Sequence, residues 1–356
     1  MQPLQYHALK VARVIDETAD AKSIVFDLPA GLGERFAYKP GQFLTLRLGQ
    51  DGETVARCYS LASSPFTGEA LKVTIKRVAG GRGSNWVCDN IGAGSVIEVL
   101  PPAGVFTPKN LDRNLLLFAG GSGVTPVMSI LKSALLRGKG HIVVVYANRD
   151  EKSVIFGAEL RDLAKAHADR LTVLHWLESL QGLPTVEQLA ALVRPYAGSH
   201  DAFICGPAPF MDGVVAALTA EGVERNRIHL EKFISLDGDP IAAVAAIEAE
   251  AKAAEAAEAA AAAGPKAEVE VVLDGVTHQF AWPANRHLLD LLLQEGVNAP
   301  FSCRMGSCSA CMCKVEAGEV KMTKNSVLDK TDLAEGWVLA CQALPVSDKV
   351  KVSFPE

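Results

Sequence analysis

Short apolar-rich segments with the pattern of β-strands, some of which alternate apolar and polar positions, recur through the first hundred residues. Segments of this kind lie at 24–28, 43–48, 71–76 and 96–100, and turns rich in Gly, Pro and Ser separate them. Short strands with regular turn signals are typical of an antiparallel barrel. We therefore expect an antiparallel β-barrel domain over residues 1–107.

The pattern changes after Thr107-Pro108. Continuous apolar runs at 115–119, 142–146, 171–174 and 201–205 alternate with segments of helical periodicity. Strands that are apolar at every position are typical of a parallel sheet covered by helices on both faces. Residues 108–236 are therefore predicted to form an α/β domain with a parallel sheet.

A tract of biased composition follows. Residues 241–263 are almost entirely Ala with Glu and Lys, and Gly264-Pro265 ends the tract. Such sequences form mostly helical, semi-rigid spacers, and roughly 30 helical residues would span about 45 Å. Because no sustained apolar stripe is present, we interpret residues 237–266 as a linker, with a packed helix as the alternative.

The remaining residues, 267–356, show the pattern of a small α+β domain. Apolar segments at 269–273 and 278–280 flank Asp274-Gly275, a strong signal for a β-hairpin turn. Residues 287–294 have the pattern of a short helix. The chain as a whole is thus predicted to be multidomain.

Composition narrows the functional class. Hydrophobic residues make up 49% and charged residues 21%, the formal net charge is −6, and no basic run suggests nucleic-acid binding. The N-terminal segment lacks the features of a signal peptide. Glycines and Pro126 interrupt the most apolar segment, 115–131, so we expect no membrane span and a cytoplasmic location.

Five of the eight cysteines lie in the last domain, and four of these have a characteristic spacing. Cys303, Cys308 and Cys311 follow the pattern Cys-x4-Cys-x2-Cys, and Cys341 comes thirty residues later. This spacing fits a 2Fe–2S cluster, whereas zinc, the alternative, favours paired Cys knuckles. The four cysteines are the predicted metal ligands, and Cys313, outside the spacing, is interpreted as a structural thiol.

On these residues the last ninety positions resemble plant-type ferredoxins. The resemblance implies a β-grasp fold around the cluster.

Two motifs in the first domain resemble those of the ferredoxin–NADP reductase superfamily. They are Arg57-Cys58-Tyr59-Ser60 and the segment from Gly80 to Trp86, which reads as a phosphate-binding loop. The resemblance implies an Arg that neutralises a flavin pyrophosphate, an aromatic ring that stacks on the isoalloxazine, and a Ser hydroxyl near flavin N5. A Tyr packed in a barrel core is the alternative. The expected FAD-binding residues are Arg57, Cys58, Tyr59, Ser60, Lys76, Gly81, Gly83, Ser84 and Asn85.

A Gly-rich turn follows the first apolar strand of the second domain. Gly120 to Pro126 links this strand to a helix whose N-terminus suits a dinucleotide pyrophosphate. Cys205-Gly206-Pro207 resembles the superfamily's second nicotinamide motif, with a buried structural thiol as the alternative. The expected nucleotide-binding residues are Gly121, Gly123, Thr125, Pro126, Asn148, Arg149, Cys205, Gly206 and Pro207. Arg149 could meet the 2′-phosphate of NADPH, but the Asn-Arg pair resembles NADH-using members, so we expect NADH, with NADPH possible.

The second domain ends with His229-Leu-Glu231-Lys-Phe233. The resemblance implies that Glu231 lies near the flavin and that Phe233 covers the ring. With Ser60 and Cys205, Glu231 completes the expected catalytic set. His229 has no matching role, and we interpret it as a packing or surface residue.

Together these parts indicate an NADH-dependent oxidoreductase that passes electrons from NADH to FAD, to the 2Fe–2S cluster and then to a separate oxygenase. The closest resemblance is to reductases that serve Rieske hydroxylases such as 3-ketosteroid 9α-hydroxylase. Reductases of phenylacetyl-CoA epoxidase or another di-iron oxygenase are the alternative. A ferredoxin carrier with an inactive reductase part is the non-enzyme alternative. The last domain has eight Lys/Arg against twelve Asp/Glu from Ala267 onward, which suggests transient docking on a basic face of the acceptor.

Overall fold

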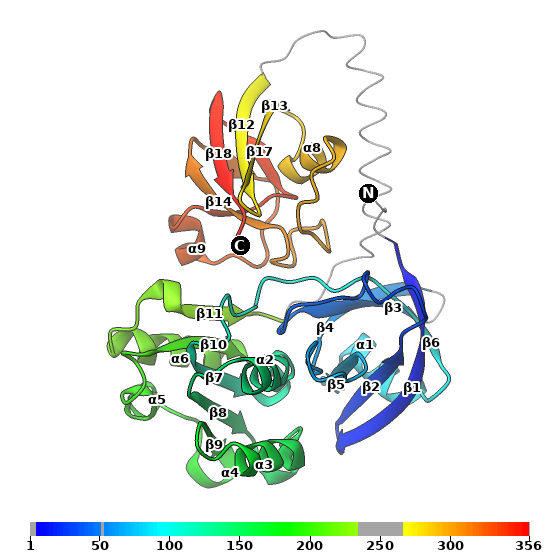
Figure 1. Ribbon diagram of the computed structural model, residues 1–356, viewed down its shortest axis with the longest axis vertical. Coiled ribbons are helices and arrows are strands. Elements are labelled where there is room, and N and C mark those ends of the chain that lie inside the picture. Colours follow the sequence, from blue (N-terminus) through cyan, green and yellow to red (C-terminus); the bar gives the residue numbers. More distant parts are fainter. Residues whose placement is uncertain (1–4, 51–52, 234–265, 356) are drawn as a thin grey trace.

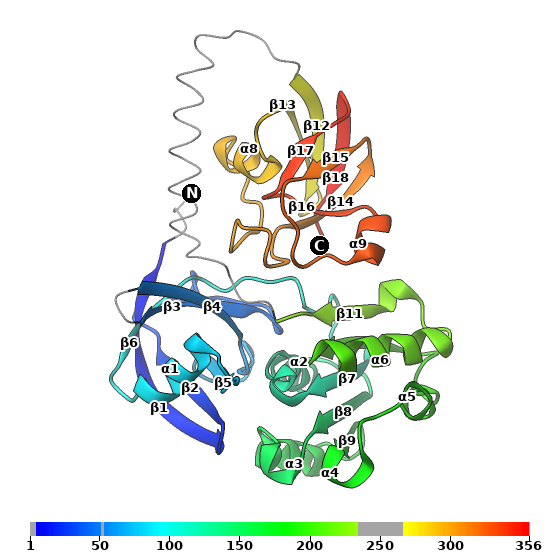
Figure 2. The same ribbon diagram turned by 180° about the vertical axis from the view of Figure 1, so that it is seen from behind.

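The computed structural model describes residues 5–50, 53–233 and 266–355, arranged as three domains (Figure 1). The predicted linker at 237–266 lies outside the described residues except for Lys266, which begins a strand. The third domain sits across the junction of the first two in opposite views (Figures 1 and 2). The boundary near residue 107 and the linker stay predictions.

The first domain is a six-stranded antiparallel sheet in the order β4-β3-β6-β1-β2-β5. Alternate positions face inward, as Leu9 and Val11 do on the first strand, and their burial builds the core. The antiparallel fold is confirmed. Its elements are β1 (His7–Thr18), β2 (Ala21–Asp27), β3 (Phe43–Gln50), β4 (Glu53–Ser60), β5 (Lys72–Lys76), α1 (Arg82–Asn90) and β6 (Val96–Val99).

One local expectation in this domain was wrong. The segment predicted as a phosphate-binding loop becomes helix α1 at Arg82, so Ser84 and Asn85 lie in its first turn. The Asn85 amide donates to the carbonyl oxygens of Gly81 at 2.8 Å and Val78 at 3.0 Å, which fixes the entry to the helix. Glycines at 80, 81 and 83 had suggested a loop, but a helix start also tolerates them.

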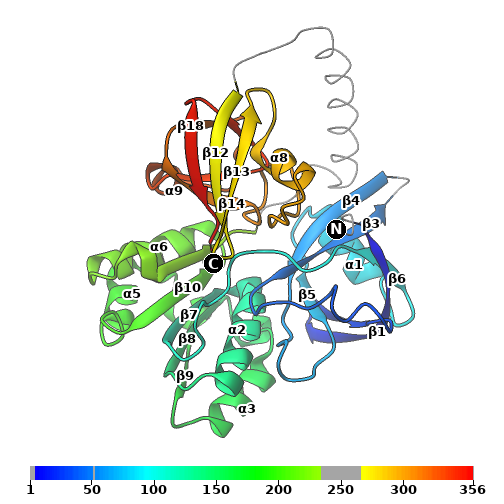
Figure 3. The same ribbon diagram turned by 45° about the horizontal axis from the view of Figure 1, so that its top comes forward.

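The second domain has a five-stranded parallel sheet in the order β11-β10-β7-β8-β9, with helices on both faces (Figure 3). Adjacent residues of the central strand pack into two different cores, Leu115 and Leu117 into one and Leu116 and Phe118 into the other. This explains the continuous apolar runs. The elements are β7 (Asn114–Gly120), η1 (Gly121–Gly123), α2 (Val124–Arg137), β8 (Ile142–Asn148), η2 (Glu151–Ser153), α3 (Gly157–Ala166), β9 (Leu171–Leu177), α4 (Glu178–Gln181), α5 (Val186–Val193), β10 (His200–Cys205), α6 (Ala208–Ala220), η3 (Arg225–Arg227) and β11 (Ile228–Glu231).

The third domain has a mixed sheet in the order β13-β12-β18-β14-β16 beside a two-stranded ribbon, β15-β17. The predicted hairpin turn is present, with left-handed φ angles of 50° at Asp274 and 74° at Gly275. The elements are β12 (Lys266–Leu273), β13 (Val276–Pro283), α8 (Leu288–Gln294), β14 (Met312–Ala317), β15 (Val320–Met322), α9 (Lys330–Ala334), β16 (Trp337–Leu339), β17 (Ala343–Pro345) and β18 (Lys349–Ser353).

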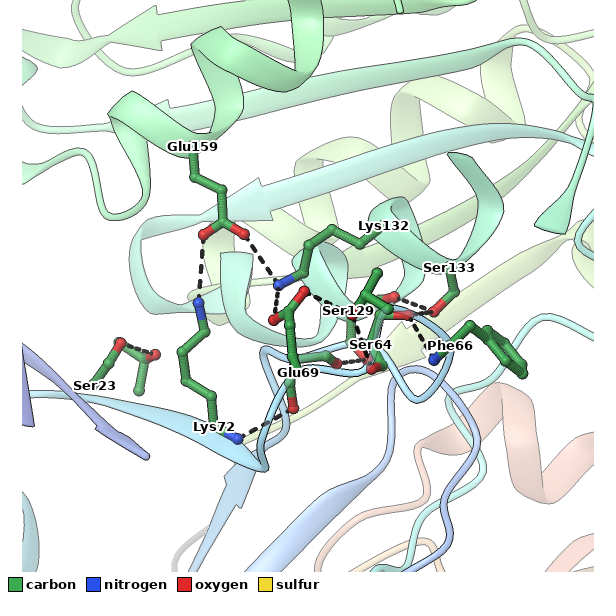
Figure 4. Close-up of polar contacts among 12 residues, drawn as sticks. Ser23, Ser64, Phe66, Glu69, Lys72, Ser129, Lys132, Ser133 and Glu159 are labelled. Atoms are coloured by element: carbon green, nitrogen blue, oxygen red, sulfur yellow. Dashed lines mark hydrogen bonds and ion pairs between the residues drawn. The ribbon is translucent and has the colours of Figure 1, made fainter. Parts of the chain in front are cut away.

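A buried ammonium group joins the first two domains (Figure 4). Lys132 of α2 is 5% exposed, and its Nζ lies 2.7 Å from Glu69 of the first domain and 3.0 Å from Glu159 of α3. Glu159 also pairs with Lys72 of β5 at 3.4 Å. Beside this network Ser129 donates to the carbonyl oxygen of Ser63 at 2.6 Å. These contacts fix the orientation of the two domains.

Lys132→Met should lower the stability of this junction. The change keeps side-chain length but leaves two carboxylates without their shared cation, which we expect to cost about 2 kcal/mol because both acids are partly solvated. The thermal unfolding midpoint should fall by about 4–8 °C, as measured by differential scanning calorimetry. Lys139→Met, at an exposed position, is the control. Equal midpoints for the two variants would contradict the assignment.

Candidate functional site

A cavity of about 560 Å³ opens where the three domains meet. Its walls come from β4, β5 and α1 of the first domain, the turn after β7, the end of β11, and the cysteine-rich loop of the third domain. The lining residues are Phe43, Arg57, Cys58, Tyr59, Ser60, Thr74, Lys76, Val78, Gly80, Gly81, Arg82, Gly83, Ser84, Ser122, Thr125, Glu231, Lys232, Phe233, Ser307, Cys308 and Ser309.

Strand β4 places the first flavin motif in this cavity. Arg57 and Tyr59 are two positions apart and so share one face of the strand, and Ser60 lines the cavity at the strand end. Arg57 donates to the carbonyl oxygen of Ala56 at 2.7 Å, which holds its guanidinium in place. Burial raises the pKa of Tyr59, so its phenol is neutral and its ring can stack on a planar ligand.

The N-terminus of α1 forms the neighbouring wall. Gly81, Gly83 and Ser84 all line the cavity. A Cβ at Gly83 would lie 3.0 Å from Cγ of Arg57, so the glycine lets the helix approach the arginine closely. Backbone N–H groups at the start of a helix, beside an arginine, suit a phosphate group. The Ser84 hydroxyl accepts a hydrogen bond from the Val78 N–H at 3.2 Å.

The two nucleotide motifs of the second domain touch each other. A Cβ at Gly123 would lie 2.1 Å from the carbonyl oxygen of Cys205, and one at Gly120 would lie 2.8 Å from Cδ of Pro207. Glycine is therefore required where the turn after β7 packs on the end of β10. Helix α2 begins directly after this turn, with Pro126 in its first turn, and Thr125 and Ser122 line the cavity.

Cys205, an expected nicotinamide-binding residue, lies at the end of β10. It is fully buried and does not line the cavity, and burial raises the pKa of its thiol, which is neutral. Gly206 packs on Gly120, and Pro207 caps α6. The cysteine lies beside Glu231, its partner in the β10–β11 register. A role of Cys205 toward the nicotinamide stays a prediction.

Asn148 and Arg149 lie outside the cavity lining, at the same carboxyl edge of the parallel sheet. The register pairs Gly120 of β7 with Ala147 of β8, so Asn148 follows directly beside the Gly-rich turn. The Asn148 side chain is buried near the Tyr146 hydroxyl, and its amide nitrogen and oxygen make no hydrogen bond of normal geometry among the described residues. An orphaned buried amide of this kind fits a ligand that supplies the missing hydrogen bonds.

Glu231 and Phe233 reach the cavity from the end of β11. Glu231 is buried, and burial raises the pKa of its carboxyl to about 8. It is therefore mostly protonated at neutral pH and can donate a hydrogen bond. Phe233 is 50% exposed, as suits a ring that covers a ligand. Lys232, between them, pairs with Asp329 of the third domain at 3.1 Å.

The four predicted metal ligands are buried, three of them in the loop before β14 and Cys341 in the segment after β16. Cys303 and Cys308 form one hydrogen-bonded pair, and Cys311 and Cys341 form another. Backbone N–H groups of Met305 and Ser307 lie 3.4 Å from the Cys303 sulfur. The hydrogen bond with Cys308, together with backbone N–H groups, lowers the pKa of Cys303 to about 6, which favours the thiolate.

The pairing of the thiols is compatible with a binuclear cluster. Among the described residues, no group of three Cys, His, Asp or Glu side chains is placed to hold a metal ion. Two thiol pairs with N–H donors aimed at sulfur match a binuclear cluster. The tight loop depends on Gly306, whose φ is 70° and whose Cβ would lie 2.8 Å from the carbonyl oxygen of Lys324. Cys313 packs in the core of the domain, and burial raises the pKa of its thiol.

The cysteine loop and the flavin motif share one wall. Cys303 and Cys308 pack against Phe43 and Ala56 of the first domain. Beside them the hydroxyls of Thr45 and Ser302 lie 3.2 Å apart. Because Cys308 also lines the cavity, a ligand there would lie against a cluster ligand.

The sequence did not predict several residues that line the cavity. Thr74 was predictable, because it is two positions from Lys76 on β5 and the two side chains therefore point to the same face of the strand. Ser307 and Ser309 flank Cys308 and could also have been inferred. Phe43 and Lys232 carry no local signal of their role. Conversely Asn85, Gly121, Gly123, Pro126, Asn148, Arg149, Cys205, Gly206 and Pro207 were predicted but do not line the cavity.

Comparison with protein families agrees with this geometry. Residues 8–107 match the oxidoreductase FAD-binding domain, residues 117–216 the oxidoreductase NAD-binding domain, and residues 271–346 the 2Fe–2S iron–sulfur cluster binding domain.

Full-length relatives decide the family. The chain is 56% identical to the ferredoxin reductase component of 3-ketosteroid-9-alpha-monooxygenase from Rhodococcus rhodochrous, over 97% of this chain and 96% of the relative. The chain belongs to the family of oxygenase ferredoxin reductases. It is also 35% identical to a component of the 1,2-phenylacetyl-CoA epoxidase of Escherichia coli, over 98% of each chain. The expected oxidoreductase with FAD, NAD and 2Fe–2S domains is confirmed.

Solved structures show the same fold for this reductase. Phthalate dioxygenase reductase matches over 98% of both chains with a TM-score of 0.57 and 20% identity. Full-length CYP116B46 from Tepidiphilus thermophilus matches 99% of this chain and 43% of its own length, with a TM-score of 0.64 and 24% identity. In the described part of the reductase, no helix is both long and apolar enough to cross a membrane.

Cys341→Ser should abolish the cluster and spare the flavin, because the fourth thiol comes from a separate segment and closes the site. We expect loss of bound iron and cluster absorbance, while electron transfer from NADH to ferricyanide, which takes electrons from flavin, continues. The matched control is Cys313→Ala, which removes a thiol two residues from Cys311 and should keep the cluster. Iron and sulfide analysis checks both, and a Cys341→Ser variant with full iron content would refute the ligand set.

Flavin reduction should slow as pH rises through about 8, the raised pKa of Glu231. Below this pH the carboxyl is protonated and neutral, and above it a buried anion disfavours transfer of hydride to the adjacent ring. In Glu231→Gln, which mimics the protonated state, this pH dependence should be absent. Anaerobic stopped-flow measurement across pH 6–9 (about the range that brackets the transition) checks it. A Gln variant with the original profile would exclude Glu231 as the titrating group.

Proposed function

We propose that this reductase oxidises NADH, holds FAD as the hydride acceptor, and delivers electrons singly through a 2Fe–2S cluster to a separate terminal oxygenase. The observation that carries the proposal is one cavity lined by the flavin motif, the β7 turn and Cys308. When bound, flavin exchanges both hydride and single electrons, and the cluster carries one electron at a time.

The first domain would hold FAD. Arg57 and the N-terminus of α1 would neutralise and bind its pyrophosphate, as their shared wall and the close approach at Gly83 support. Tyr59 would stack on the ring system, and the Ser60 hydroxyl would hydrogen-bond the ring edge. Cys58 and Lys76 line the same cavity and would complete the flavin contacts.

The second domain would present the nicotinamide. The turn at Gly121 and Gly123 and the start of α2 would bind the pyrophosphate of the nucleotide. The buried side-chain amide of Asn148 would form hydrogen bonds with the adenosine ribose, and Arg149 would lie next to that sugar. Phe233 would cover the flavin ring and exclude water until nicotinamide enters. Glu231 would hold a proton at its carboxyl beside the reacting atoms.

The third domain would receive the electrons. Cys303, Cys308, Cys311 and Cys341 would bind the cluster, and the packing of Cys308 on the cavity keeps the path short. Two ion pairs support this docked position. Arg225 lies 3.2 Å from Asp332 and Lys232 lies 3.1 Å from Asp329, both contacts linking the second domain to the α9 region.

The oxygenase partner is inferred from relatives. At 51–56% identity over nearly the whole chain, the relatives named for 3-ketosteroid-9-alpha-monooxygenase favour a Rieske hydroxylase that acts on a 3-ketosteroid. A di-iron oxygenase such as phenylacetyl-CoA epoxidase is the second candidate, supported at lower identity.

Docking is proposed to be transient because the cluster must be free for the next electron. We propose a cytoplasmic location, because a reducing compartment keeps the cysteines available to bind the cluster.

Anaerobic stopped-flow spectroscopy with NADH and NADPH tests the proposal. We expect rapid flavin reduction by NADH, followed by loss of cluster absorbance, and slower reduction by NADPH. The fully reduced protein should then reduce a 3-ketosteroid 9α-hydroxylase oxygenase in a second mixing step. If flavin stays oxidised with both nucleotides while the cluster is intact, the chain is a carrier with an inactive reductase part and the proposal fails.

A further inference from the structure

Asp20 forms a charged bridge between the first two domains, separate from the Lys132 network. It lies in the two-residue turn between β1 and β2, and its Oδ2 lies 3.1 Å from Nη2 of Arg149 in the second domain. The same oxygen lies 3.7 Å from Nζ of Lys76 on β5. Its Oδ1 accepts a hydrogen bond from the Thr18 hydroxyl at 2.8 Å, which orients the carboxylate toward both cations.

Both cations lie at the nucleotide end of the parallel sheet. Arg149 directly follows β8, one strand away from the Gly-rich turn after β7. A Cβ at Gly121 in that turn would lie 4.0 Å from Nζ of Lys76. In open parallel sheets a nucleotide binds outside the carboxyl ends of the strands, and an Arg after the second strand can receive the 2′-phosphate of NADPH.

A 2′-phosphate would therefore meet Arg149 together with the carboxylate that pairs with it. This phosphate carries about −1.5 to −2 charges at neutral pH, whereas NADH has an uncharged hydroxyl at the same position. A free guanidinium binds phosphate well through its planar fork of donors. Here the Asp20 carboxylate already pairs with one nitrogen of the Arg149 guanidinium and adds a negative charge. The Asp20–Arg149 pair therefore favours the 2′-hydroxyl of NADH over the 2′-phosphate of NADPH.

Neighbouring carboxylates have other partners. Asp150 follows Arg149 in sequence, but its Oδ1 accepts a hydrogen bond from the Ser153 N–H at 2.9 Å as the cap of η2. Glu17, on the same hairpin as Asp20, accepts a hydrogen bond from Ser23 at 2.5 Å. Asp20 is therefore the acid that neutralises Arg149, at ion-pair distance from its guanidinium.

We propose that Asp20 is a specificity-determining residue that sets the preference for NADH over NADPH by holding Arg149 and Lys76 in ion pairs. It acts through these cations and not by contact with the reacting atoms. The inference rests on the proposed nucleotide oxidation and adds to it a determinant that lies in the flavin domain.

Asp20→Asn tests this directly. The amide keeps the size of the side chain and removes its charge, so Arg149 becomes available to a 2′-phosphate. We expect the ratio of kcat/KM for NADPH to that for NADH to rise about two- to fivefold, mainly through a lower KM for NADPH, as loss of one partly screened ion pair allows. Inhibition constants provide a binding readout, since 2′,5′-ADP should gain affinity relative to ADP.

Three comparisons separate specificity from a general structural effect. Asp16→Asn removes an equal charge from the same hairpin, where Asp16 is 79% exposed and paired with Lys22, and should leave the ratio unchanged. Asp20→Glu restores the charge and should restore NADH preference. In Arg149→Ala the further change Asp20→Asn should alter the ratio far less, because the cation it frees is gone.

The outcomes are distinct. A ratio that rises in Asp20→Asn only when Arg149 is present supports the proposal. An unchanged ratio, or an equal rise in Asp16→Asn, overturns it while NADH oxidation by the wild-type protein continues. Failure of the wild-type protein to reduce flavin with either nucleotide would instead overturn the proposed function.

Discussion

The packing of the cysteine loop against strands β3 and β4 is the contact on which the rest of the arrangement depends. Cys303 and Cys308 bury themselves against Phe43 and Ala56, and the Thr45 and Ser302 hydroxyls pair within the same contact. Electrons cross from one cofactor site to the other only if the two sites adjoin. Since partly exposed ion pairs contribute little free energy, we attribute docking mainly to the apolar contact and orientation to the pairs at Asp329 and Asp332.

The junction of the first two domains solves a different problem. Hydride transfer requires the nicotinamide and flavin rings to be held in one precise relative position, and small displacements from that position slow the reaction strongly. Lys132 between two carboxylates and the buried hydrogen bond from Ser129 to the carbonyl oxygen of Ser63 are both rigid, because neither a buried charge nor a buried hydrogen bond can shift without a large penalty. The third domain is held instead by an apolar patch and by two partly exposed ion pairs, Arg225–Asp332 and Lys232–Asp329.

The sequence predicts most of this architecture because the decisive signals are local. Period-two alternation, continuous apolar runs, the Asp274-Gly275 turn and the cysteine spacing each depend on residues close in the chain. The sequence did not predict the helix start at Arg82, because three nearby glycines suggested a loop. In the structure the side-chain amide of Asn85 donates to the carbonyl oxygen of Gly81 and stabilises the first turn of the helix. Burial of Cys205 under Gly123, and the meeting of Lys132 with Glu69, join segments more than sixty residues apart. No local pattern encodes such contacts.

Charge along the cavity wall explains how an acidic protein can offer a site that suits an anionic cofactor. The chain has a net charge of −6, yet Arg57, Lys76, Arg82 and Lys232 line the cavity against one acid, Glu231. Burial raises the pKa of that acid to about 8, so at neutral pH it adds little negative charge. The pyrophosphate proposed to bind here would therefore meet a cationic wall. In the proposed function the protonated carboxyl would provide a hydrogen-bond donor at the end where hydride is transferred, and there a fixed anion would oppose the reaction.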